Sequence, residues 1–124
     1  MNVKIDTKEK FRVLTPAENV LSVNMTDELK NLLLSCLNAD VKNVILNLKE
    51  VQTADNEIAE QILTIQQQFY EAGYSFVICE LNPALEQQLD EAEILELMNV
   101  TPTESEAWDI VQMEEIEREL LGDE

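Results

Sequence analysis

Short apolar runs near the start of the chain predict β-strands. Residues 3–6 and 11–14 are two such runs, and the charged residues 7–10 between them predict a hairpin. A third short apolar run covers residues 20–23. The chain is therefore expected to begin with strands.

The apolar spacing becomes helical after Thr26 and changes back to a strand pattern near residue 44. The residues on the helical stripe are Leu29, Leu32, Leu33, Cys36 and Leu37. Thr26 is the predicted N-cap, with Asp27 and Glu28 favourably placed for the helix dipole. Residues 44–48 are nearly all apolar, which predicts a strand buried on both faces. This order of elements predicts a right-handed parallel crossover.

A second helix is predicted after the polar residues 53–57. Its apolar stripe consists of Ile58, Ile62, Ile65 and Phe69. Gly73 is placed to end this helix, and residues 74–79 form the next predicted buried strand. Pro83 begins a shorter predicted helix that runs through Leu89, and residues 90–96 are still largely compatible with helix. Residues 97–100 predict a last strand.

A terminal helix completes the predicted domain. It opens with a capping box formed by Thr103 and Glu106, and Trp108 is predicted to anchor it to the core. The whole order of elements predicts one α/β domain, with a mixed β-sheet of four to five strands packed with about four helices. We assign residues 1–113 to the domain body and residues 114–124 to an acidic helix end or tail of the same domain.

The charge of the chain is large and unevenly distributed. Among 124 residues, 26 are acidic and 8 are basic, which gives a net charge of −18. Residues 1–50 hold seven acids and seven bases, so the whole net charge arises in residues 51–124, where Arg118 is the single base. Such a chain would repel nucleic acid and anionic membrane surfaces. A basic protein surface is the expected partner, with association that weakens at high salt.

The composition also excludes most of the common types of catalytic and cofactor site. The chain has no histidine, so nucleophile triads that depend on it are absent, and its two cysteines cannot build a Cys-rich metal site. Cys36 and Cys79 lie in apolar runs and are expected to be buried hydrophobic residues. No glycine-rich phosphate loop, signal peptide or membrane-spanning stretch is present. We therefore expect a cytoplasmic protein that is not an enzyme and holds no cofactor or metal.

Four segments, residues 41–51, 55–58, 71–73 and 99–103, together resemble the STAS domain, the fold of bacterial anti-sigma-factor antagonists. Residues 41–51 are similar to the central strand of the family, and residues 55–58 fall where its Asp-Ser-Ser-Gly signature opens the second helix. The segments 71–73 and 99–103 also match the family pattern, and residues 113–120 resemble STAS proteins of Bacteroidetes type. The resemblance covers nearly the whole chain and implies a protein-binding module.

The signature itself has largely changed. The resemblance implies that the phosphoacceptor serine of the family is Glu57 here, the first serine is Asn56 and the glycine is Ile58, so only Asp55 is retained. Two further family acids are replaced by Asn47 and Ser22. We therefore expect no phosphorylation at the usual position. The implied partner site is the loop with Thr53, Asp55, Asn56, Glu57 and Ile58, together with a helix face that includes Gln61 and Gln66.

Two interpretations of Glu57 remain open from the sequence. Its carboxylate could hold the site in a permanently phosphate-like state, although it carries less charge than phosphoserine. Alternatively, Asp55 caps the helix and Glu57 only complements the helix dipole. Two classes of function remain as well: an interaction module that binds an anti-sigma factor or a kinase-like regulator, or a STAS-like domain that binds a nucleotide or another small molecule.

Overall fold

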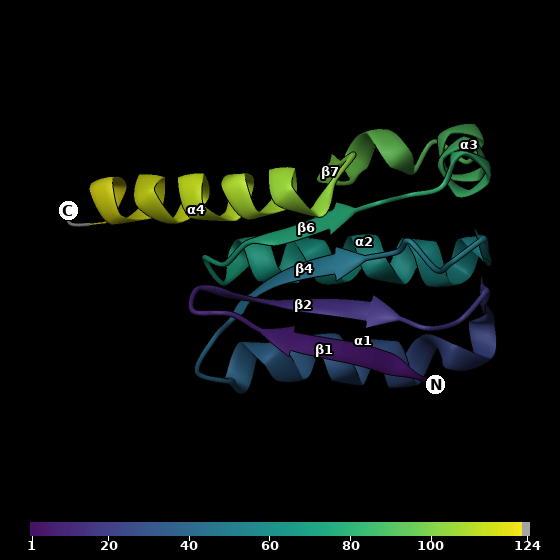
Figure 1. Ribbon diagram of the computed structural model, residues 1–124, viewed down its shortest axis with the longest axis horizontal. Coiled ribbons are helices and arrows are strands. Elements are labelled where there is room, and N and C mark those ends of the chain that lie inside the picture. Colours follow the sequence, from purple (N-terminus) through teal and green to yellow (C-terminus); the bar gives the residue numbers. More distant parts are fainter. Residues whose placement is uncertain (123–124) are drawn as a thin grey trace.

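The computed structural model describes residues 1–122, in which five strands form one mixed sheet (Figure 1). The strand order is β1-β2-β4-β6-β7, and only β1 and β2 pair in antiparallel fashion. The strands are β1 (Val3–Thr7), β2 (Phe11–Pro16), β4 (Asn43–Asn47), β6 (Phe76–Cys79) and β7 (Val100–Thr101). Two further short strands, β3 (Val20–Leu21) and β5 (Thr53–Ala54), form a separate parallel pair. The predicted hairpin and mixed sheet are confirmed.

Four α-helices accompany the sheet in the described part of the chain, as predicted. They are α1 (Thr26–Ser35), α2 (Asn56–Glu71), α3 (Pro83–Glu91) and α4 (Glu104–Leu121). Short 3-10 segments cover Val23–Met25, Cys36–Asn38 and Leu95–Leu97. Helix α4 crosses position 113 without interruption, and residues 123–124 of the predicted acidic segment lie outside the described residues. No helix within residues 1–122 combines the length and apolar character needed to cross a bilayer.

The sheet separates two apolar clusters. Helices α1, α2 and α3 pack on one face, against side chains that include Leu14 and Leu46. Helix α4 packs on the other face, where Ala107 and Val111 meet Ile45 and its neighbours. Because side chains alternate along a strand, β4 supplies both clusters and is buried throughout, which explains its nearly continuous apolar sequence.

Trp108 anchors α4 as the sequence predicted. Its ring is half-buried and lies 5.1 Å from that of Phe11, centroid to centroid. The N-cap of the helix is Thr103, whose hydroxyl accepts a hydrogen bond from the backbone N–H of Glu106 at 3.2 Å. These two contacts fix the start of α4 against the sheet.

Three local predictions differ from the structure. Thr26 is the first residue of α1 and not its N-cap, because its hydroxyl donates to the carbonyl of Val23 in the preceding 3-10 turn. Helix α3 includes Asp90 and Glu91 and ends there, the Leu95–Leu97 segment is a separate 3-10 turn, and the last strand covers Val100–Thr101 rather than residues 97–100. Glu93 adopts a positive φ of 62° and turns the chain so that Ile94 becomes buried. The burial of this side chain outweighs the helical preference of the surrounding residues.

Both cysteines are free and buried, as expected. Burial raises the pKa of the Cys36 thiol. Burial also raises the pKa of Cys79 to about 12, and the nearby carboxylates of Glu104 and Glu80 add to this shift. Both thiols are therefore protonated near neutral pH, and protonated thiols are poor nucleophiles.

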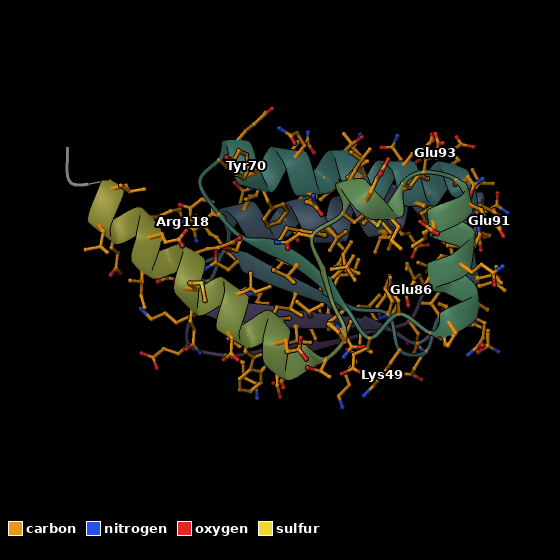
Figure 2. All side chains as sticks on the ribbon, turned by 90° about the horizontal axis from the view of Figure 1, so that it is seen from above. Lys49, Tyr70, Glu86, Glu91, Glu93 and Arg118 are labelled. Carbon is orange, nitrogen blue, oxygen red and sulfur yellow. The ribbon has the colours of Figure 1, made fainter. Side chains whose placement is uncertain are left out.

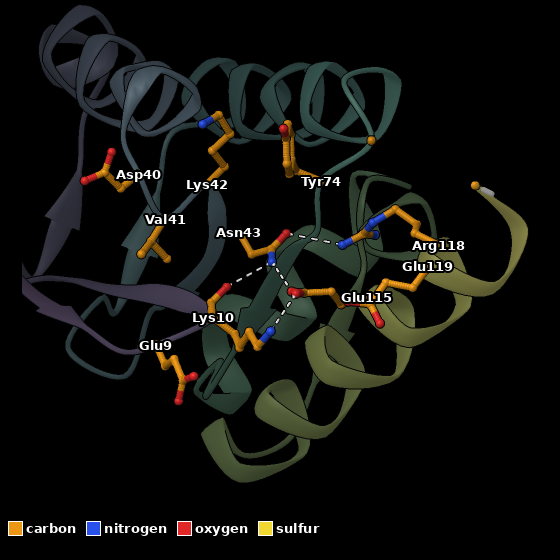
Figure 3. A pocket seen from close by; sticks show the side chains of 12 residues that line it. Glu9, Lys10, Asp40, Val41, Lys42, Asn43, Tyr74, Glu115, Arg118 and Glu119 are labelled. Atoms are coloured by element: carbon orange, nitrogen blue, oxygen red, sulfur yellow. Dashed lines mark hydrogen bonds and ion pairs between the residues drawn. The ribbon is translucent and has the colours of Figure 1, made fainter.

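A polar network fixes the second half of α4 to the sheet, and Asn43 is at its centre (Figure 3). The amide nitrogen of this residue donates to the Lys10 carbonyl and to Glu115, both at 2.9 Å. Its amide oxygen accepts from the backbone N–H of Ser75 at 2.9 Å and from Arg118 at 3.3 Å. The side chain is nearly inaccessible, with 6% of the residue exposed. A fully satisfied buried network of this kind holds α4 in one orientation.

We predict that Asn43→Ala lowers the free energy of unfolding by about 1–3 kcal/mol, because its partners would remain buried without their hydrogen bonds. Urea unfolding followed by circular dichroism measures this change. Asn31→Ala is the matched control at an exposed position of α1, and it should shift stability by less than about 0.5 kcal/mol. Equal effects of the two substitutions would contradict the role of the network.

Candidate functional site

The predicted loop lies at the carboxyl ends of β4 and β6, where open α/β sheets commonly bind ligands. It leaves the short strand β5 and enters α2. The C-terminal end of α3 approaches the same place, because Glu91 lines a hollow with Asp55 and Asn56. In Figure 2 this end of the molecule is on the right, where Glu86, Glu91 and Glu93 are labelled.

Asp55 joins three segments of the chain at this loop. Its carboxylate accepts a hydrogen bond from the backbone N–H of Val23 at 2.8 Å. Its own N–H donates to the carbonyl of Leu21 at 2.8 Å, and its carbonyl accepts from the N–H of Ala59 at 3.1 Å. Asp55 does occupy the N-cap position of α2, but its side chain makes no capping bond to that helix. The carboxylate therefore holds the loop to the start of the Val23–Met25 turn.

Gln88 on α3 holds the loop from the other side, and this residue was not among those predicted from the sequence. Its amide nitrogen donates to the Ala54 carbonyl, and its amide oxygen accepts from the Ala54 N–H at 3.5 Å. The same nitrogen lies 3.3 Å from the side-chain oxygen of Asn56. No local signal could identify this residue, because its partners are 32 and 34 positions away in sequence.

The loop residues differ in how accessible they are. Thr53, Asn56 and Glu57 are exposed, and the Glu57 side chain takes part in no hydrogen bond or ion pair with residues 1–122. Ile58 is completely buried in the α2 core. A partner could therefore reach the carboxylate of Glu57, whereas Ile58 holds the first turn of the helix in place.

The two glutamines predicted on the partner face have different roles. Gln66 is half-buried, and its amide accepts from the N–H of Asn99 at 2.9 Å and donates to the carbonyl of Leu97 at 3.1 Å. It therefore positions the turn that enters β7. Gln61 is also half-buried, but five residues of an α-helix rotate by about 140°, so the two glutamines do not share one face.

The surface around Glu57 is acidic. Glu60 lies exposed one turn further along α2, and Glu91 is exposed at the end of α3. The hollow beside the loop has a volume of about 430 Å³ and is lined by Ala54, Asp55, Asn56, Gln88, Glu91 and Ala92. The helix dipole of α2 stabilises a carboxylate in its first turn. Residues 1–122 contain no cluster of three or more His, Cys, Asp or Glu side chains able to hold a metal ion.

Asn47 lies on β4 and is 2% exposed, and its side chain bonds to α4. Its amide nitrogen donates to Glu104 at 3.0 Å, and its amide oxygen accepts from the N–H of Lys49 at 3.0 Å. Glu104 also accepts a hydrogen bond from the indole of Trp108 at 3.2 Å. An amide is suited to this position because it can donate to the carboxylate that faces it.

Comparisons with known proteins give one family model and several solved structures of similar fold. A model of the STAS domain matches residues 2–107. No curated protein sequence matches the chain. The chain is similar in structure to a candidate anti-sigma factor antagonist from Thermotoga maritima, with a TM-score of 0.77, 20% identity, and coverage of 89% of this chain and 94% of that one.

Two further solved structures have the same fold. One is a serine-to-glutamate variant of RsbS from Moorella thermoacetica, with a TM-score of 0.73, 17% identity, and coverage of 90% of this chain and 96% of that chain. The other is the anti-sigma factor antagonist SpoIIAA in its unphosphorylated form, with a TM-score of 0.70, 13% identity, and the same two coverages of 90% and 96%.

We predict that Asn47→Asp lowers the free energy of unfolding at neutral pH by about 1–3 kcal/mol, because the introduced carboxylate would face Glu104 without a donor. Like charges raise the folded-state pKa of such a pair, so the destabilisation should appear as the pH rises and fade on acidification. Urea unfolding at several pH values measures it. The double variant Asn47→Asp/Glu104→Gln reverses the donor and acceptor and should regain most of the loss. Failure of this rescue would contradict the assigned contact.

Proposed function

This chain belongs to the STAS domain family, and we propose that it acts as a non-catalytic protein-interaction module of the anti-sigma-factor-antagonist kind. Its partner would be a protein, such as an anti-sigma factor or a kinase-like regulator, that binds the loop of residues 53–58. A role in the cytoplasm is in keeping with two free thiols.

One observation supports this proposal most directly. The backbone of the loop is held by hydrogen bonds, whereas the carboxylate of Glu57 within it has no partner in residues 1–122. Asp55 and Gln88 hold the backbone around Glu57 through hydrogen bonds. The Glu57 side chain is exposed and has no partner within residues 1–122. A loop already ordered before binding loses little conformational freedom when a partner contacts it.

The charge around the loop favours a basic protein surface over a nucleotide. Glu57 and Glu60 on α2 and Glu91 on α3 are exposed, and Asp55 and Glu91 line the hollow beside the loop. These carboxylates would repel the phosphates of a nucleotide. Lysine or arginine side chains of a partner would instead be attracted, and this attraction would accelerate association.

Glu57 also supports the view that the contact is not controlled by phosphorylation. Residues 55–58 carry no hydroxyl group, and Thr53 is the nearest hydroxyl-bearing residue of the loop. A glutamate in the first turn of α2 supplies a permanent negative charge next to N–H groups that no side chain caps. Its single charge cannot be added or removed by a kinase and a phosphatase.

We predict that residues 53–58 carry no phosphate in protein purified from its native cells, because the exposed acceptor position holds a carboxylate. Peptide mapping by mass spectrometry measures this. The control is the variant Asn56→Ser/Glu57→Ser, which adds hydroxyls at exposed positions and should gain phosphate if a cognate kinase is present. The control variant does not include Ile58→Gly, because removing this buried side chain would lower the free energy of unfolding by about 2–5 kcal/mol. Phosphate on Thr53 of the unmodified chain would contradict the proposal.

We predict that Glu57→Lys releases the partner protein, because it reverses the charge at the centre of the docking loop. Affinity capture from extracts of the native cells, quantified by mass spectrometry, measures the loss. The matched control is Glu71→Lys, which makes the same change at an exposed position at the other end of α2.

Proteins that bind the unmodified chain and Glu71→Lys equally, but not Glu57→Lys, are the expected partners. Their binding should also weaken between about 0.05 M and 0.5 M salt, since screening shortens the range of surface charges. Partners lost equally from both variants, or bound independently of salt, would be evidence against docking at this loop.

A further inference from the structure

The second half of α4 exposes an apolar stripe that the fold does not use. It consists of Met113, Ile116 and Leu120, which are 58%, 57% and 76% exposed. We call these three residues the α4 seam. Their spacing of three and then four residues places them on one side of the helix, as in the contact line of a coiled coil.

The α4 seam lies on the side of the helix that faces away from the sheet. Ala107 and Val111 are fully buried against the sheet, and Arg118 on the same side bonds to Asn43 and Ser75. At 100° per residue, the centre of the seam is roughly 180° around the helix from these residues. The seam therefore contributes nothing to the core, and three large apolar side chains on one exposed line are typical of a binding surface.

The helix that carries the seam is already held in place. Glu115 bonds to both Lys10 and Asn43, and Glu114 accepts a hydrogen bond from the Ser75 hydroxyl at 2.6 Å. These contacts fix the buried side of the last turns, while Figure 1 shows this part of α4 extending past the end of the strands. A partner would meet a preformed helix that is open on its outer side.

The charges beside the seam select the kind of partner. Glu117 lies on one side of it and Glu119 on the other, and both are exposed. In a pair of helices these flanking positions face charged residues of the partner. A second copy of this chain would bring glutamates against glutamates, which is unfavourable, and its net charge of −18 adds to the repulsion. Lysine or arginine at the facing positions would be complementary.

We propose that the α4 seam docks an amphipathic helix of a partner protein whose apolar stripe is flanked by lysine or arginine. This surface is separate from the loop at Glu57. It lies toward the end of the molecule where Tyr70 and Arg118 are labelled in Figure 2, whereas Glu91, next to the loop, is at the opposite end. The domain would then bind two protein elements at once, one at the loop and one at the α4 seam. The contact at the α4 seam would not depend on binding at the loop.

A designed peptide tests this chemistry with the full chain. The probe is a helix of about 21 residues with leucine at the a and d positions of each heptad and lysine at e and g. We expect weak, salt-sensitive binding in isothermal titration calorimetry, with NMR shifts concentrated on residues 112–121. Ile116→Lys should weaken the binding by about tenfold or more. The matched control Ile5→Lys changes the net charge equally at an exposed position on β1 and should bind as the unmodified chain does.

Two control peptides distinguish the docking of a basic helix on the α4 seam from nonspecific attraction between a basic peptide and this acidic chain. A peptide of the same composition in scrambled order should not bind, and neither should one with glutamate at e and g. Equal loss in Ile116→Lys and Ile5→Lys, or equal binding of the lysine and glutamate peptides, would overturn the proposal. Sedimentation equilibrium of the chain alone is the further check: a dimer that Ile116→Lys dissociates would assign the seam to a second copy and overturn the assignment to a basic partner.

Discussion

The hydrogen bond from the Val23 N–H to the Asp55 carboxylate is the contact on which the proposed binding loop depends. The resemblance aligns Asp55 with the aspartate of the family signature, and the backbone of this residue also bonds to Leu21 and Ala59. One residue thus joins the β3–β5 pair, the 3-10 turn and the start of α2. Since Gln88 holds the preceding residue, Ala54, the loop has a defined shape before any partner arrives. The acidic surface at this end of the sheet follows from that shape.

The structure contradicts one part of the second interpretation of Glu57, because the side chain of Asp55 does not cap α2. Asp55 does occupy the N-cap position, but its carboxylate is used elsewhere, so it does not satisfy the first N–H groups of α2. Glu57 is then the acid nearest to these groups along the chain, and the helix dipole stabilises its charge. The adjacent Ile58 is buried and fixes the first turn. A permanent charge on an ordered backbone at this position is in keeping with the proposed contact, which needs no phosphorylation.

Local patterns predicted most of the fold, and long-range contacts account for what they missed. The buried strand β4, the end of α2 near Gly73 and the start of α3 at Pro83 all follow from short-range spacing and turn chemistry. The bonds of Gln88 and Gln66 join segments about thirty residues apart, so no window of sequence reveals them. Asn47 illustrates the same limit, because its partner Glu104 is 57 positions away.

The proposed function requires that a protein partner docks on the loop of residues 53–58. Amide hydrogen exchange of the chain, alone and bound to its captured partner, tests it most directly, because protection reports where the backbone becomes less accessible. Docking at this loop should add protection over residues 53–60 and at the end of α3, around residues 88–92. Unchanged exchange in both segments, with protection appearing only elsewhere in the chain, would contradict it.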